Sequence, residues 1–88
     1  MHALLSIVLH HEKPKDYAEF EERLESLKWE KRIRMTWSAR FNADVSYDGA
    51  VTTTKADIRA AMGKGKVKGL DAVLQIGNER AVSFSMKS

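Results

Sequence analysis

The stretch Arg32-Ile-Arg-Met-Thr-Trp-Ser-Ala-Arg-Phe41 alternates polar and apolar residues over ten positions. Its polar residues are Arg32, Arg34, Thr36, Ser38 and Arg40, and its apolar residues are Ile33, Met35, Trp37, Ala39 and Phe41. Successive side chains of a strand point to opposite faces of its sheet. The period of two therefore predicts one strand over residues 32–41, with a basic face and an apolar face.

Two elements are predicted ahead of this strand. Residues 3–9 are apolar except for Ser6, which is typical of a central strand buried on both faces. Pro14 suits a first helical turn, and apolar residues then recur at helical spacing, namely Tyr17, Phe20, Leu24 and Leu27. Asp16 and Glu19 have the spacing of a capping box, which competes with a helix start at Pro14. We expect an amphipathic helix here.

The chain after residue 41 is predicted to contain a turn (42–44), a strand from 45 that is interrupted at Asp48-Gly49 and ends near 52, a helix from 54, and a hairpin (70–76 and 82–86). Thr54 with Asp57 suggests the start of that helix, and Gly63 is expected to end it. Gly77-Asn78 is expected to open the hairpin.

The resulting order is βαββαβ with an added C-terminal strand, so we expect a single α+β domain over residues 1–88 with a ferredoxin-like plait. Both helices would cover one face of an antiparallel sheet. The last strand must then add to a sheet edge or reach another subunit. Because Phe84 and Met86 on an unpaired edge would favour aggregation, we expect a homodimer. The alternative is a hairpin that folds back within its own subunit.

Composition excludes several classes of protein. The chain has 88 residues and no cysteine, so disulfide scaffolds, cysteine zinc sites and thiol nucleophiles are excluded. Its longest apolar run is too short to cross a bilayer, and no signal-peptide pattern precedes it, so we expect a cytoplasmic protein without a membrane partner. Residues 31–88 hold eleven basic and five acidic residues. This excess suggests a nucleic-acid partner, although solubilising charge is the alternative.

The basic face of the predicted strand is the first candidate site. Alternate residues of a strand lie about 6.6–7 Å apart, close to the spacing of successive phosphates at about 6–7 Å. The candidate phosphate contacts are Arg32, Arg34 and Arg40, with Lys28, Lys31 and a stacking surface on Trp29 at the strand entrance. The alternative is a solvated face, or arginines paired with acids of a neighbouring strand or subunit.

The segment Gly63–Gly69 is the second candidate, because it carries Lys64, Lys66 and Lys68 between glycines. It lacks the order of a Walker A motif, so the lysines would act as point charges toward phosphate. The alternative is a solvated loop whose lysines favour the negative end of the helix dipole.

The third candidate is His10-His11-Glu12. Adjacent histidines of an extended chain point to opposite faces and no further ligand is evident, so neither a metal nor another cofactor is expected. One histidine could act as a general base near an RNA hydroxyl, because imidazole titrates near neutral pH. Loop histidines at a sheet edge are the alternative. No catalytic motif is present.

Two short motifs resemble the GhoS family of small antitoxins with endoribonuclease activity. They are Tyr17…Arg23-Leu24-x-Ser26-Leu27-x-Trp29 and Ala50-Val-Thr-Thr53. The resemblance implies a ferredoxin-like fold related to CRISPR-associated nucleases, and cleavage of transcripts. Of the basic residues on that family's first helix, only Arg23 has a counterpart, since Glu25 occupies the next candidate position. His10 stands where related nucleases usually place an acid.

Two functions follow as hypotheses. The first is a small nucleic-acid-binding regulator, preferably of RNA. Its enzymatic form is an antitoxin-type endoribonuclease with Arg23 and His10 as catalytic candidates. The second is a non-enzymatic protein-interaction or inhibitor module, of the kind that mobile elements encode, that docks on a partner through a sheet face or its last strand.

Overall fold

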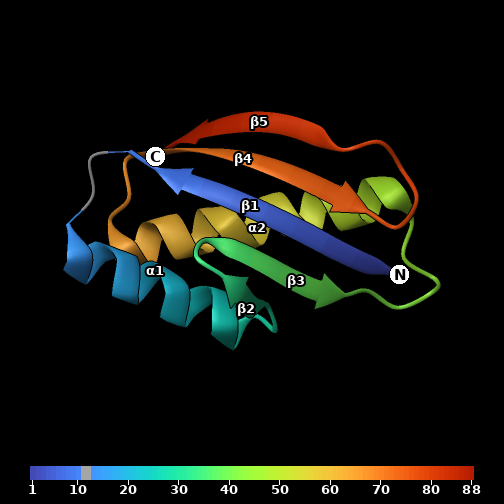
Figure 1. Ribbon diagram of the computed structural model, residues 1–88, viewed down its shortest axis with the longest axis horizontal. Coiled ribbons are helices and arrows are strands. Elements are labelled where there is room, and N and C mark those ends of the chain that lie inside the picture. Colours follow the sequence, from blue (N-terminus) through green and yellow to red (C-terminus); the bar gives the residue numbers. More distant parts are fainter. Residues whose placement is uncertain (11–12) are drawn as a thin grey trace.

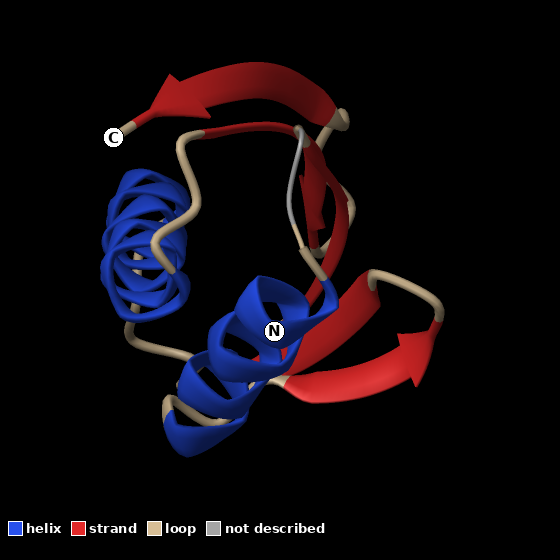
Figure 2. Ribbon diagram, turned by 90° about the vertical axis from the view of Figure 1, so that its left-hand side faces the viewer, coloured by secondary structure: helices blue, strands red, loops and turns tan. Residues whose placement is uncertain are grey.

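The order of elements expected from the sequence is found, but two of the elements lie elsewhere along the chain. The computed structural model describes residues 1–10 and 13–88. The elements are β1 (His2–Leu9), α1 (Pro14–Ser26), β2 (Glu30–Ile33), β3 (Thr36–Arg40), α2 (Tyr47–Gly65), β4 (Gly69–Ile76) and β5 (Val82–Lys87). They form an α+β fold with one antiparallel sheet of order β2-β3-β1-β4-β5 (Figure 1). Both helices cover the same face of the curved sheet (Figure 2).

The central strand β1 has one buried and one open face. It pairs with β3 on one side and with β4 on the other. Ala3, Leu5, Ile7 and Leu9 are buried under the helices, whereas Leu4 is 50% and Val8 64% exposed. The expectation of burial on both faces is wrong, because both helices lie on one side of the sheet. The open face is therefore free of helices.

The prediction of a single strand over residues 32–41 is wrong, because the chain forms a hairpin there. Ile33 pairs with Thr36 across a two-residue turn, and the ladder shifts register between Lys31 and Ile33. Arg34 lies in that turn with φ 52°, a left-handed conformation. Trp37 remains inward and is fully buried. Ile33, which was expected on the same face as Trp37, is 68% exposed.

Helix α2 replaces the strand predicted over residues 45–52. Ser46 is its N-cap, and the Ser46 side chain accepts a hydrogen bond from the Gly49 amide at 3.0 Å. Thr54 is buried within the helix rather than at its start, and its hydroxyl donates to the Ala50 carbonyl at 2.8 Å. The run of β-branched residues has a weak helix preference, but burial of the face bearing Ala50, Thr54 and Ile58 decides the outcome.

The two helices meet where α2 ends and α1 begins. Helix α2 continues past Gly63 and ends at Gly65, with Lys66 in the left-handed conformation at φ 56°. A Cβ on Gly65 would lie 2.8 Å from the Asp16 carbonyl oxygen, so glycine permits this close approach. Helix α1 begins at Pro14, and Asp16 Oδ2 accepts from the Lys13 amide at 3.4 Å. Asp16 therefore lies at N3, so the helix start at Pro14 is confirmed over the competing capping box of Asp16 with Glu19.

The final strand β5 pairs with β4 of the same chain. Met86 is buried, and Phe84 is half-buried against the core. The hairpin therefore folds back within its own subunit, and the need to bury Phe84 and Met86 in another subunit disappears. Among the described residues, no helix is long and apolar enough to span a membrane.

Candidate nucleic-acid interface

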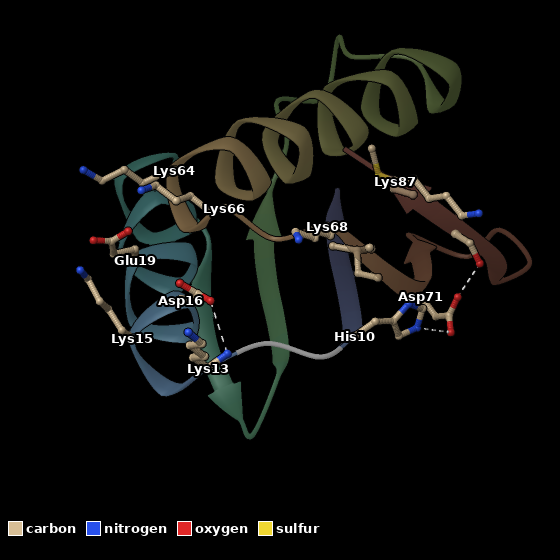
Figure 3. Close-up of a pocket in the computed structure, with 14 residues that line it drawn as sticks. His10, Lys13, Lys15, Asp16, Glu19, Lys64, Lys66, Lys68, Asp71 and Lys87 are labelled. Carbon is tan, nitrogen blue, oxygen red and sulfur yellow. Dashed lines mark hydrogen bonds and ion pairs between the residues drawn. The ribbon is translucent and has the colours of Figure 1, made fainter.

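A cleft lies at the end of the sheet where β1 ends, β4 begins and β5 ends. These termini meet because the three strands are antiparallel neighbours, with Leu9 opposite Leu70 and Gly69 opposite Lys87. The first turn of α1 and the last turn of α2 complete the walls. The cleft has a volume of about 1030 Å³. Figure 3 shows lysines of both helix ends on one side of it, and His10 beside Asp71 on the other.

Lysines dominate the lining of this basic cleft. They are Lys13, Lys15, Lys64, Lys66, Lys68 and Lys87. All six except Lys68 form no ion pair with any carboxylate that the structure describes. The cleft also holds Asp16, Glu19 and Asp71, but Asp16 accepts from the α1 N-terminus and Asp71 accepts from His10 and Ser85. The lining therefore has an excess of positive charge.

The lysines of the two helices differ in their local roles. Lys64 and Lys66 lie at the C-terminal end of α2, where the helix dipole favours cations. Lys13 and Lys15 lie at the N-terminal end of α1, where the dipole disfavours them. The first pair thus has a structural use, whereas the second pair adds positive charge where the helix already contributes it. An anion in the cleft would relieve that repulsion.

A hydrogen-bonded cluster of His10, Asp71 and Ser85 lies at the edge of the cleft. His10 Nε2 lies 2.9 Å from Asp71 Oδ2, and the Ser85 hydroxyl donates to Asp71 Oδ1. The hydrogen bond from Ser85, followed by that from His10, lowers the pKa of Asp71 below its ordinary 3.8. Asp71 is therefore ionised at neutral pH and accepts from both partners. The His10 proton accordingly lies on Nε2 in the neutral ring, which leaves a lone pair on Nδ1.

The three arginines predicted to share a strand face are dispersed. Arg32, on β2, forms an ion pair with Glu30 at 3.1 Å and donates to Ser38 Oγ at 2.7 Å. Arg34 is in the hairpin turn, and Arg40 is at the other end of β3, 3.4 Å from His2 Nε2. These three arginines therefore do not form a continuous phosphate track along one strand.

The residues predicted at the strand entrance do not join the basic cleft either. Lys31 forms an ion pair with Glu21 of α1, and Lys28 is exposed with φ 76°. Trp29 is only 2% exposed, and its indole donates to Asp57 Oδ2 at 2.9 Å. It also packs edge-on against Phe41. The expectation of a stacking surface on Trp29 is wrong.

The two catalytic candidates are not brought together. His10 lies in the cleft, whereas Arg23 is in the last turn of α1, about 13 Å along the helix axis from Pro14. The Arg23 side chain is exposed beside Ser26. His11 and Glu12 lie outside the described residues. Among the residues that are described, no three metal-ligating side chains cluster.

Sequence reasoning missed Lys13, Lys15, Asp71, Ser85 and Lys87. Each lies outside the motifs that stand out along the chain, because the cleft gathers residues from α1, α2, β4 and β5 and from the loops β1–α1 and α2–β4. The predicted ferredoxin-like plait implies the needed neighbours, since in that fold the end of the first strand lies beside the start of the fourth.

Comparison of the chain with known proteins finds no significant match among family models, among curated proteins or among solved structures. The function is therefore argued from the geometry of the basic cleft.

Proposed function

We propose that the protein binds the phosphate backbone of a nucleic acid, preferably single-stranded RNA, in the basic cleft. One observation carries this proposal. Five lysines without a described ion-pair partner surround one cleft, and they are Lys13, Lys15, Lys64, Lys66 and Lys87. Unpaired cations that gather at one concave site bind a polyanion strongly, because each neutralised phosphate releases condensed counterions.

The composition of the cleft favours phosphate contacts over base contacts. Among the described residues that line it, none is Phe, Tyr or Trp. Proteins that read bases of single strands usually stack them on such rings. Lysine acts as a point charge and carries little geometric specificity. We therefore expect weak dependence of affinity on base sequence and strong dependence on salt.

The strand order supports the finer assignment to a ferredoxin-like plait. The segment β2-β3-β1-β4 has two β-α-β crossovers, through α1 and α2, and β5 extends the sheet beyond β4. The resemblance to the GhoS family adds the preference for RNA. A small cytoplasmic RNA-directed regulator of the antitoxin type is the cellular role we propose.

The test compares two variants with the same change of charge. The cleft variant carries Lys15→Ser, Lys64→Ser and Lys87→Ser, and the control variant carries Lys28→Ser, Arg40→Ser and Arg80→Ser. All six side chains are exposed, so both variants should fold. Fluorescence anisotropy with a short labelled RNA should show a loss of affinity of at least tenfold for the cleft variant only. Equal losses of affinity in both variants would mean that the net charge of the protein, and not the cleft, determines binding, and would overturn the proposal.

A further inference from the structure

We propose that His10 is a general base that cleaves RNA held in the basic cleft, with Asp71 as its positioning residue. This inference rests on the proposed function, because the cleft must first hold the RNA. It adds the cleavage reaction, the nitrogen atom of His10 that accepts the proton, and the product.

The geometry fixes the histidine in one orientation. The His10 amide donates to the Gly69 carbonyl at 3.0 Å, which extends the β1–β4 ladder by one residue. The His10 ring then reaches Asp71 on the same neighbouring strand, and Ser85 on β5 holds the other oxygen of that carboxylate. Three adjacent strands thus determine the position of one imidazole ring. Such a supported ring loses little freedom when a substrate binds.

A glycine lies beside the second nitrogen of the ring. Asp71 accepts a hydrogen bond from Nε2–H, so Nδ1 carries the lone pair. A Cβ on Gly69 would lie 3.3 Å from Nδ1, so a side chain at this position would crowd the nitrogen. The His10 side chain is 43% exposed, and it lines the same cleft as the lysines. A ribose hydroxyl of a bound strand can therefore approach Nδ1.

The reaction is an internal transesterification of the RNA backbone. Nδ1 of His10 takes the proton of a ribose 2′-hydroxyl, and the 2′-oxygen attacks the adjacent phosphorus. The bond between phosphorus and the 5′-oxygen breaks, and that oxygen takes a proton from water. The hydroxide left behind is neutralised by the proton on His10. The products are a 2′,3′-cyclic phosphate and a 5′-hydroxyl, and no oxidant or reductant is consumed.

The lysines would stabilise the charge that develops during this step. The phosphorus gains a further oxygen ligand, and negative charge accumulates on its non-bridging oxygens. Ammonium groups already placed around the phosphate require little reorganisation at that moment. Lys68 is next to Gly69 in the chain, and Lys87 is opposite Gly69 in the β4–β5 ladder, so both lie near the histidine.

The test measures RNA binding and RNA cleavage in the same samples. A short single-stranded RNA is incubated with excess protein in buffer with EDTA, and the ends of the fragments are identified by mass spectrometry. The full chain should produce 2′,3′-cyclic phosphate ends, and the same strand made of DNA should remain intact. His10→Ala should lower the single-turnover rate about 100-fold or more without changing RNA affinity. His2→Ala, at the opposite end of β1, is the matched control and should cleave normally.

Asp71→Asn should lower the cleavage rate and shift its pH profile without weakening RNA binding, which a structural role would not explain. RNA binding without cleavage, or His10→Ala that cleaves like the parent chain, would overturn this inference and leave the proposed function intact. Absence of RNA binding by the parent chain would overturn the proposed function itself. Cleavage that occurs only without EDTA would require a divalent metal ion, and would also contradict the inference that His10 is a sufficient base.

Discussion

At the scale of the residue, Asp71 is a carboxylate whose surroundings favour its charged form. Ser85 and His10 both hydrogen-bond it and hold its pKa below 3.8. The folded-state pKa is therefore depressed. The resulting stabilisation is present above pH 3.8 and is lost as the pH falls through the lowered pKa of Asp71.

This pKa shift gives a direct test of the hydrogen-bonded cluster. Because the Ser85 hydroxyl is the main cause of the shift, Ser85→Ala should raise the pKa of Asp71 toward its ordinary value. The measurement is an NMR pH titration of the Asp71 carboxyl carbon in the parent chain and the variant. Ser83→Ala, two residues earlier on the same face of β5, is the control and should leave the titration unchanged. An identical Asp71 pKa in all three proteins would mean that the cluster does not exist in solution.

At the scale of the element, the contact between the helix ends depends on Gly65. A Cβ there would clash with the Asp16 carbonyl and approach Phe20 Cβ to 3.1 Å. We expect Gly65→Ala to destabilise the fold by about 1–3 kcal/mol, since overpacking exceeds the gain in helix propensity. Gly63→Ala meets no atom within 4 Å and should stabilise by about 0.5–1 kcal/mol. Urea unfolding followed by circular dichroism measures both. A neutral Gly65→Ala would show that α1 and α2 are further apart than described.

The same scale shows what the sequence could predict. The amphipathic pattern of α1 and the alternation in β4 and β5 were sufficient to predict these three elements. Each pattern has only one backbone geometry that buries its apolar residues. The hairpin at Arg34 was missed because its turn lacks the Gly or Asn that usually marks a positive φ. The start of α2 was missed because the Ser46 cap precedes a run of β-branched residues, and burial of Ala50 and Thr54 overrides their local preference.

The candidate site was only partly predictable for a related reason. The lysines of the Gly63–Gly69 segment and His10 stand out in the sequence and do line the cleft. Lys13 and Lys15 lie within residues 12–30, which carry a net negative charge, so the sequence did not suggest them as anion contacts. Asp71, Ser85 and Lys87 can be recognised as part of the site only after the pairing of β4 and β5 places them near His10.

At the scale of the whole molecule, the homodimer stays a prediction, but its surface changes. The apolar residues of β5 pack within the chain, whereas Leu4, Val8 and Val73 are 50%, 64% and 45% exposed on the helix-free face. A second copy placed face to face would cover them. Light scattering should show a dimer for the parent chain and a monomer for the Leu4→Gln, Val73→Thr variant. A monomeric parent chain at tens of micromolar would contradict the dimer.

The central claim is that RNA phosphates occupy the basic cleft, and the salt dependence of binding tests it most directly. Each phosphate neutralised on a single strand contributes about 0.7 to the slope of log affinity against log salt. Between about 50 and 200 mM salt, the slope should be smaller by about 2 for the cleft variant lacking Lys15, Lys64 and Lys87. The control variant lacking Lys28, Arg40 and Arg80 should keep the slope of the parent chain. The same slope for the cleft variant and the parent chain would contradict the account.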